Sequence, residues 1–324
     1  MLASELHQHT AVGGRLLLLG GGSNLLLTRD FDGKVVTPKA KFSISVIMEA
    51  GTNIPYLKCW AGTTFDEVVD YAVRHGYYGM ENLSLIPGQC GASAVQNIGA
   101  YGAEAKDFIS EIEAVEMSTG RVVHFTQADC HYSYRQSRFK NEWKNRYLIT
   151  YVTYRLSRKF EPILDYGNVR SKLSEAHIDV EALTAQQLRD TIIEIRQDKL
   201  PDPAVTGNAG SFFMNPIIDE ETFRKLKEKV PDLHYFKVDD RGEAICNDEA
   251  PRNCRYKIPA GWMIERCGWK GKLLGHAGVH SKQALVLINE GGATGQDILN
   301  LMQAIQHDVK AAFGLDIRPE VNVI

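Results

Sequence analysis

Long apolar runs, paired cysteines and a secretion signal are all missing from this chain of 324 residues. No stretch reaches the ~20 consecutive apolar residues that a membrane-spanning helix requires. The six cysteines stand apart and form no CxxC pair, which is typical of free thiols in a reducing compartment and not of a disulfide framework. The first residues also lack the basic and apolar regions of a leader peptide. We therefore expect a cytoplasmic protein.

Excess positive charge is absent as well. A net charge of −3 does not attract nucleic acid or an anionic membrane surface, so we expect neither as a partner. His276 and His280 have the spacing of a helical metal site, but the HExxH pattern is missing and glycines lie beside them. We therefore expect no metal.

The composition is that of an ordinary globular protein, with 44% hydrophobic and 24% charged residues. The length predicts two or three domains, and irregularly mixed helix and strand patterns predict the α+β class. The expected strands cover residues 15–19, 34–37, 42–47, 56–60, 109–117, 121–125, 147–156, 211–214 and 284–288, and the expected helices cover a short stretch before residue 15 and residues 64–76, 184–198, 220–229, 259–267 and 294–313.

The clearest domain boundary follows the helix that a Thr184–Gln187 capping box begins. Pro201 and Pro203 cannot continue this helix. We expect a first subdomain over residues 1–38, a second over 39–203, a separate domain over 204–314 and a C-terminal segment over 315–324.

Two stretches with almost no side-chain bulk point to a ligand. Residues 20–24 (the glycine loop, Gly-Gly-Gly-Ser-Asn) follow the apolar run Leu16–Leu19, and residues 86–102 (the small-residue segment) contain four glycines and three alanines. A strand that ends in glycines presents converging N–H groups to an anion. The Rossmann pattern GxGxxG is absent. One such loop alone is usually a tight turn, but two of them predict a dinucleotide cofactor.

Three single residues are further candidates, each with an ordinary alternative. Arg135 lies among aromatic residues and can meet a carboxylate, or belong to a solvated basic strand. Ser211 follows small residues and precedes two phenylalanines, outside any GxSxG pattern, so it is a proton donor or a simple hydrogen-bonded serine. Glu320 by itself resembles a surface acid.

In order, these stretches resemble the UDP-N-acetylenolpyruvoylglucosamine reductase (MurB) family, flavoenzymes of peptidoglycan synthesis and thus of cell-wall biogenesis, cell shape and cell division. The resemblance is carried by GGGSN at 20–24, IPGxxG…QNIGAYG at 86–102, YRxSxFK at 134–140, GNAGSFFxNP at 207–216, AGWxIE at 260–265 and PEV at 319–321. The YRxSxFK element and the stretch around Tyr235 resemble the first subtype of the family.

The resemblance implies an FAD-binding unit of the vanillyl-alcohol-oxidase type, made of two subdomains, and a separate α+β substrate-binding domain. FAD would be bound without a covalent link, with its pyrophosphate on the glycine loop and the small-residue segment. The implied cofactor contacts are Gly20, Gly21, Gly22, Ser23, Asn24, Pro87, Gly88, Gly91, Ala92, Asn97, Ile98, Gly99, Ala100, Tyr101 and Gly102.

The implied reaction has two halves. NADPH reduces the flavin, and after NADP has left, flavin N5 gives hydride to C3 of UDP-N-acetylglucosamine enolpyruvate, which becomes UDP-N-acetylmuramate. By motif match, Ser211 would protonate C2, while Arg135 and a protonated Glu320 would hold the carboxylate and stabilise the enolate. The implied substrate contacts are Tyr134, Tyr166, Lys199, Asn215, Tyr235, Lys270 and Gln283, of which Lys199 and Lys270 suit the UDP phosphates.

The chain departs from the family pattern at two places. Relatives usually carry a strand with Asn-Thr-Phe upstream of the glycine loop, so we expect a shortened first subdomain with an unpaired strand edge and weaker FAD retention. Met214 stands where many relatives carry Lys.

Two other functions stay open at this point. A flavin oxidase of the same cofactor fold could tether its flavin through Cys90, and a nucleotide-sugar binding module would bind no FAD. We expect a monomer.

Overall fold

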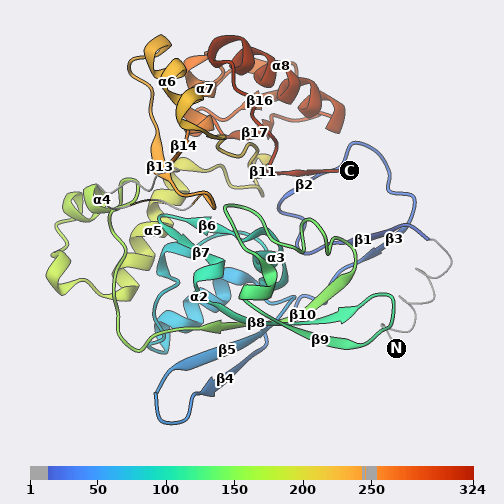
Figure 1. Cartoon of the computed structure of the whole chain (residues 1–324), viewed down its shortest axis with the longest axis vertical. Coiled ribbons are helices and arrows are strands. Elements are labelled where there is room, and N and C mark those ends of the chain that lie inside the picture. The colour runs from blue at the N-terminus through green and yellow to red at the C-terminus, as the bar shows by residue number, and fades with distance from the viewer. Residues whose placement is uncertain (1–13, 243–244, 246–253) are drawn as a thin grey trace. The chain divides into compact units, whose positions relative to one another are not determined.

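The computed structural model describes residues 14–242, 245 and 254–324, which form two compact units (Figure 1). The first unit comprises Met1–Ser23 and Asp32–Asp198, and the second comprises Asn24–Phe31 and Lys199–Ile324. The helix expected before residue 15 and Cys246 lie outside the described residues. All five described cysteines are free, as predicted.

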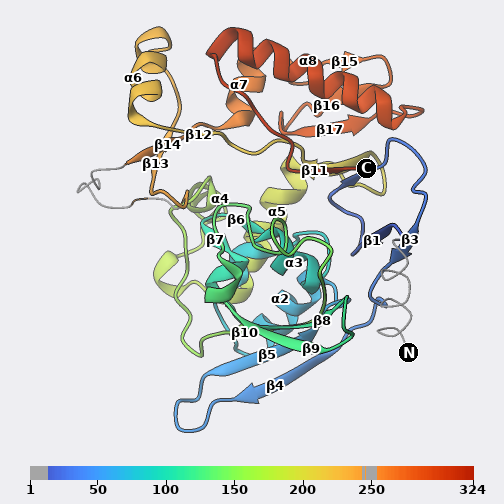
Figure 2. The ribbon, with the colours of Figure 1, turned by 45° about the vertical axis from the view of Figure 1, so that its right-hand side comes forward.

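The first unit is built around an antiparallel sheet of five strands in the order β4-β5-β10-β8-β9. Its strands are β4 (Ile44–Met48), β5 (Pro55–Trp60), β8 (Ile109–Glu116), β9 (Val122–Thr126) and β10 (Tyr147–Arg155). Helices α2 (Phe65–Arg74) and α3 (Cys90–Gln96) lie on one face of this sheet (Figures 1 and 2). Phe65 meets Tyr154 of β10 edge-on, with ring centroids 5.9 Å apart, so the core lies between sheet and helices.

Smaller elements complete the first unit. β1 (Leu16–Leu18) pairs in parallel with β3 (Lys34–Val36), and β6 (Gly99–Ala100) pairs antiparallel with β7 (Ala103–Glu104). The remaining helices are α4 (Val169–Glu175), α5 (Ala185–Lys199) and the 3₁₀ helices η1 (Glu81–Leu83), η2 (Ala105–Asp107), η3 (Ala128–Cys130) and η4 (Val180–Ala182). Arg189 donates to both carboxylate oxygens of Asp66, at 2.7 and 3.0 Å, and so fixes α5 against α2.

The second unit contains a four-stranded sheet, β11-β17-β16-β15, and a three-stranded sheet, β12-β14-β13. Their strands are β11 (Gly207–Ser211), β12 (Ile217–Ile218), β13 (Phe236–Val238), β14 (Arg255–Lys257), β15 (Leu273–Leu274), β16 (Ala277–Val279) and β17 (Val286–Asn289), and the helices are α6 (Glu220–Lys229), α7 (Ala260–Arg266) and α8 (Gly295–Phe313). A separate parallel pair joins β2 (Leu25–Leu26) to β18 (Asn322–Val323).

Helix α8 shows how local sequence forms these elements. Thr294 and Asp297 make a reciprocal capping box at its beginning, and Gly314 ends it in the left-handed conformation, with φ +73°. Its buried side chains recur every three or four residues, at Ile298, Leu301, Ile305, Val309 and Phe313. This stripe packs in the core of the second unit.

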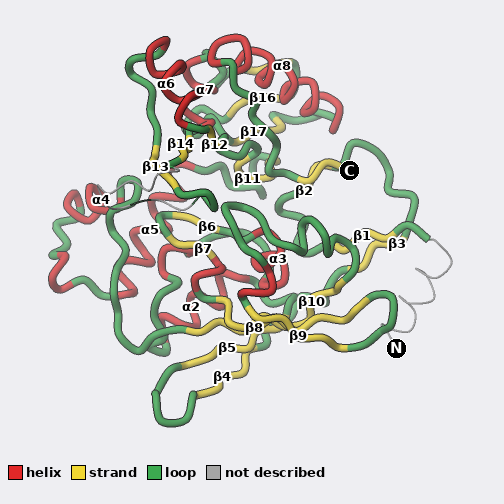
Figure 3. The backbone as a smooth tube through the Cα atoms, viewed as in Figure 1, coloured by secondary structure: helices red, strands yellow, loops and turns green. Residues whose placement is uncertain are grey.

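The predicted helices over 220–229 and 294–313 are confirmed, and both units contain a mixture of helices and strands, consistent with the α+β class (Figure 3). The strand predicted over 211–214 is wrong: β11 ends at Ser211. Asn24–Phe31 groups with the second unit and not with residues 1–23, because β2 pairs with β18. For the same reason 315–324 is part of the second unit, whose main segment begins at Lys199 instead of residue 204.

Within the described part of the chain, none of the helices combines the length and the apolar character needed to cross a bilayer.

Candidate active site

The glycine loop follows directly on β1. Gly22 has φ +73°, a conformation that a side chain with a Cβ atom rarely adopts. Among the described residues, the amides of Gly20, Gly21 and Gly22 donate no hydrogen bond to another protein group. Such amides can bind an anion without first losing a protein partner.

The small-residue segment lies against the glycine loop. A Cβ atom added at Gly20 would stand 3.4 Å from Gln89 Oε1 and 3.5 Å from the Ala92 Cβ, and one added at Gly88 would stand 3.2 Å from Ser23 Oγ. A Cβ atom added at Gly21 would stand 3.9 Å from the Cα of Gly88. The exposed Pro87 precedes this contact. The two predicted cofactor loops therefore form one surface within the first unit.

Not all of the small-residue segment is open, which corrects the expectation of freely presented amides. Residues 90–96 form α3, and the amides of Cys90 and Gly91 donate to the carbonyls of Thr63 and Ala61. A Cβ at Gly91 would stand 3.0 Å from that of Ala61. Gly91 therefore permits close packing of α3.

Arg135 is held by the end of the small-residue segment. Its own φ is +56°, and its Nη1 and Nη2 donate to the carbonyls of Asn97 and Gly99 at 3.2 and 2.5 Å. A Cβ added at Gly99 would stand 2.8 Å from Nη1 of Arg135. Glycine at position 99 is thus required for this approach, and a left-handed arginine is the kind of strain that functional sites retain.

The Asn97 side chain organises the same region instead of facing outward. It is fully buried, and its Nδ2 donates to Glu104 Oε2 and to the Ser133 carbonyl at 2.8 and 3.0 Å. Its Oδ1 accepts from the Lys106 amide at 3.0 Å. The neighbouring Ile98 and Ala100 are half-buried, and the Ile98 carbonyl accepts from the Ala105 amide.

Two tyrosines, Tyr134 and Tyr166, lie near Arg135, and a third, Tyr101, belongs to the small-residue segment. The ring of Tyr134 is 5.3 Å from the guanidinium carbon. Tyr166 packs beside Gly102, where an added Cβ would stand 3.4 Å from the Tyr166 Cβ. Partial desolvation raises the pKa of the Tyr166 phenol. The charge of Arg135 lowers this pKa, and the charge of Glu104 raises it. The carbonyl of Tyr101 accepts from Asn82 Nδ2 at 2.7 Å.

Ser211 and Glu320 come together in the second unit. Ser211 ends β11 after a bulge in which Gly210 has φ +72°, and its side chain is exposed. The next two residues, Phe212 and Phe213, are buried. The Glu320 amide donates to the Phe212 carbonyl at 2.8 Å, so the backbone of Glu320, which precedes β18, lies beside the residue that follows β11.

The Ser211 hydroxyl has no hydrogen-bond partner within the described ranges. Asn24, expected on the phosphate loop, instead donates from Nδ2 to the Glu320 carbonyl at 3.3 Å. The backbone carbonyl of Asn24 also accepts from the Asn322 amide at 3.2 Å. Asn24 therefore fixes the backbone that carries Glu320.

Helix α7 organises three of the predicted substrate contacts. The Ala260 amide at its first turn donates to Asn215 Oδ1 at 2.8 Å. A Cβ at Gly261 would stand 3.5 Å from Gln283 Oε1, and Glu265 pairs with Lys270 at 2.8 Å. The AGWxIE motif thus supports side chains from three other segments.

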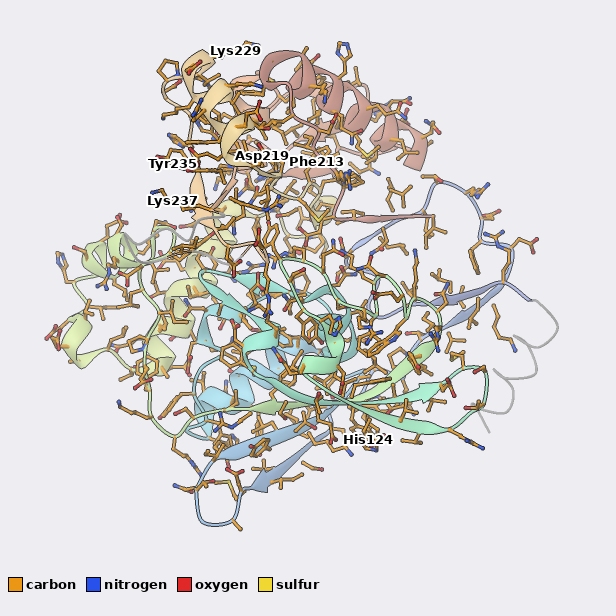
Figure 4. The ribbon with its side chains drawn as sticks, in the orientation of Figure 1. His124, Phe213, Asp219, Lys229, Tyr235 and Lys237 are labelled. Atoms are coloured by element: carbon orange, nitrogen blue, oxygen red, sulfur yellow. The ribbon has the colours of Figure 1, made fainter. Side chains whose placement is uncertain are left out.

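Two predicted contacts stand apart from this group. Tyr235, labelled in Figure 4, packs edge-on against Phe223 and Tyr256, with ring centroids 4.6 and 5.7 Å apart. Lys199 is the last residue of α5 and is half-buried. The sequence analysis missed Asn82 and Glu104, although Glu104 is the first charged residue after the uncharged run 82–103.

Both units of the chain are similar to known proteins. Residues 2–126 match the model of an FAD binding domain, and residues 202–324 match that of the C-terminal domain of UDP-N-acetylenolpyruvoylglucosamine reductase. The crystal structure of the reductase (MurB) from Thermus caldophilus is similar with a TM-score of 0.63, over 99% of this chain and 89% of that chain, at 20% identity. At that identity the likeness is one of fold, and it confirms the predicted architecture.

Relatives in sequence are closer. The UDP-N-acetylenolpyruvoylglucosamine reductase of Bacteroides fragilis (strain YCH46) is 46% identical over 308 residues, which are 95% of this chain and 87% of the relative. The protein of the same name from Burkholderia cenocepacia (strain HI2424) is 43% identical over 304 residues, 94% of this chain and 83% of the relative. With both units included in this similarity, the chain belongs to the UDP-N-acetylenolpyruvoylglucosamine reductase (MurB) family.

Proposed function

We propose that this chain is an FAD-dependent reductase that uses NADPH to convert UDP-N-acetylglucosamine enolpyruvate into UDP-N-acetylmuramate in peptidoglycan precursor synthesis. The observation that carries the proposal is the 46% identity to a relative of that name over 95% of the chain. This coverage includes both the cofactor loops and the residues around Ser211.

The residues of the first unit fit FAD. The amides of Gly20–Gly22 donate to no other described residue and suit the diphosphate, and glycine at the left-handed φ of position 22 keeps the loop surface clear of a Cβ atom. The contact between Gly20 and Ala92 adds the small-residue segment to the same surface. When bound, FAD supplies the hydride that it has taken from NADPH.

The substrate carboxylate is assigned to Arg135 and Glu320. Arg135 is fixed by the Asn97 and Gly99 carbonyls, so little side-chain freedom is lost when it orients an anion. Negative charge that develops at C2 and spreads into the carboxylate is stabilised by donors already directed at it. Glu320 acts as such a donor in its protonated form.

The proton for C2 is assigned to Ser211. Its hydroxyl is exposed, and no protein group in the described ranges competes for it. Asn215 and Gln283 are held by α7, and with Tyr134, Tyr166 and Tyr235 they would contact the sugar nucleotide, whereas Lys199 and Lys270 would meet its diphosphate.

The flavin oxidase alternative gains no support. Cys90, the thiol considered as a covalent tether, is 0% exposed and packs in the core with Cys59 and Tyr154. A side chain in that position is not available to a cofactor on the glycine loop.

Because NADPH and nucleotide-activated sugars are cytoplasmic metabolites, we also propose that the protein acts in the cytoplasm.

Stopped-flow measurement of the two half-reactions tests the proposal. Ser211→Ala should leave the reduction of bound flavin by NADPH unchanged and slow its reoxidation by the enolpyruvyl substrate by ~10²–10⁴-fold, the usual contribution of a proton donor. Arg135→Ala should impair the same half-reaction. Ser174→Ala, a change of an exposed serine on α4, is the matched control. Equal slowing of both half-reactions in Ser211→Ala would contradict the proton-donor role.

A further inference from the structure

Glu104 is a half-buried carboxylate next to Arg135 to which neither motif nor reaction has assigned a role. It lies on β7, directly opposite Gly99 of β6. Its Oε1 is 3.8 Å from Nη1 of Arg135, and the two side chains are 22% and 17% exposed. The carboxylate therefore faces the guanidinium at the same strand pair whose Gly99 carbonyl accepts from Arg135.

The chain holds this carboxylate in place independently of Arg135. Asn97 Nδ2 donates to Oε2 at 2.8 Å. The Glu104 amide donates to Asp107 Oδ2 at 2.8 Å, and the Glu104 side chain accepts from the Asp107 amide in a reciprocal capping box around η2. A carboxylate fixed from two sides can set the orientation of a guanidinium, and not only follow it.

The groups around Glu104 have opposing effects on the pKa of its carboxyl group. Burial raises the pKa of Glu104, and Arg135, the Asn97 amide and Lys106 oppose this rise, whereas Asp107 adds to it. Arg135 is therefore an important stabiliser of the Glu104 charge. The interaction is mutual, because the same contact holds the guanidinium.

We propose that Glu104 is a positioning residue for Arg135. It fixes the guanidinium together with the Asn97 and Gly99 carbonyls, so that the planar guanidinium keeps one orientation for the substrate carboxylate. This inference rests on the proposed function, which assigns that carboxylate to Arg135.

Glu104→Gln keeps the size of the side chain and an acceptor for Asn97 but removes the charge. We expect flavin reduction by NADPH to continue at the rate of the unchanged protein, while flavin reoxidation by the substrate slows about tenfold, since small errors in orientation cost this much or more. Glu111→Gln, at an exposed carboxylate on β8, is the matched control. Loss of bound flavin or of thermal stability in Glu104→Gln would indicate a merely structural role and overturn the proposal.

A double-mutant cycle with Arg135→Lys separates the possible results. If Glu104 acts through Arg135, Glu104→Gln should add little to the defect of Arg135→Lys, in the reoxidation rate and in the dissociation constant of UDP-N-acetylmuramate measured by calorimetry. Additive defects would overturn the positioning role and leave the proposed function intact. An Arg135→Lys variant with normal reoxidation would instead contradict the assignment of Arg135, and the role of Glu104 with it.

Discussion

The two units hold their candidate groups in opposite ways. In the first unit, Arg135 is fixed by the carbonyls of Asn97 and Gly99 and faces Glu104. In the second unit, the Ser211 hydroxyl is exposed at the end of a strand and unpaired in the part of the chain that the structure describes. A fixed cation suits the orientation of an anion, and an unpaired hydroxyl suits proton transfer. The comparison indicates that the first unit depends on close backbone approaches that only small residues allow.

The largest effect is expected where such a residue is replaced in the glycine loop. Gly22→Val puts a β-branched residue at φ +73° and should yield protein without flavin, measured as the ratio of flavin to protein absorbance. Gly51→Val is a matched control, because Gly51 has φ +81° and equally open surroundings in the turn between β4 and β5. A fully yellow Gly22→Val protein would contradict the assignment of the loop.

The next largest effect concerns stability within the first unit. Arg189 is 5% exposed and donates to both oxygens of Asp66, so Arg189→Ala leaves a partly buried carboxylate without its partner. The free energy of unfolding in urea should fall by about 3–5 kcal/mol. Lys225→Ala, which removes the exposed pair with Glu221 on α6, should change the free energy of unfolding much less.

The same ion pair predicts a pH dependence. Burial opposes ionisation of Asp66, but the hydrogen bonds from Arg189 and the Leu85 amide outweigh it, so the pKa of Asp66 lies below its ordinary value. A lowered carboxyl pKa gives stability that is complete above the ordinary value of about 4 and is lost as the pH falls through the native pKa. On acidification below about pH 4, the unchanged protein should therefore lose more stability than Arg189→Ala. Parallel losses would show that Asp66 is not the group concerned.

A smaller effect is expected from one methyl group beside Arg135. In Gly99→Ala the new Cβ would stand 2.8 Å from the Ala103 carbonyl oxygen and from Arg135 Nη1, so the guanidinium must move. Reoxidation of the flavin by substrate should slow about 100-fold, and by more than its reduction by NADPH. In Gly207→Ala the nearest atom is 3.5 Å away, and the half-reactions should keep their ratio.

The smallest effect is expected from substitutions at two helix caps, one in each unit. Thr294 accepts from the Asp297 amide at the beginning of α8, so Thr294→Ala should lower the free energy of unfolding by about 1 kcal/mol. Thr64 begins α2 without any such side-chain bond, and Thr64→Ala should change the stability much less. Equal losses in urea unfolding would show that the capping box contributes nothing specific.

Elements with local signals were predictable from the sequence. Asp219 caps α6 and Gly314 ends α8, and both helices have the expected bounds. Helix α3 was not predicted, because its small residues show no apolar period. The pairing of β2 with β18 was also missed, since no local pattern encodes a parallel pair between distant segments.

The roles assigned to the site residues stay predictions. The motifs named Arg135, Ser211 and the glycine loop as candidates, and the structure places Ser211 at the end of β11, the glycine loop against the small-residue segment and Arg135 on the carbonyls of Asn97 and Gly99. They did not reveal that the Gly91 amide donates to the Ala61 carbonyl, or that the Asn24 side chain donates to the Glu320 carbonyl. Such partners depend on tertiary contacts, and residue type alone does not specify them.

The bond between Asn24 and Glu320 spans 296 positions of the chain. During synthesis on the ribosome, β2 therefore cannot pair until β18 has emerged, and contacts of such long sequence separation form late. A newly made chain cannot complete the surroundings of Glu320 before that moment. Productive turnover thus begins only after β18 has been translated, however early the first unit has folded.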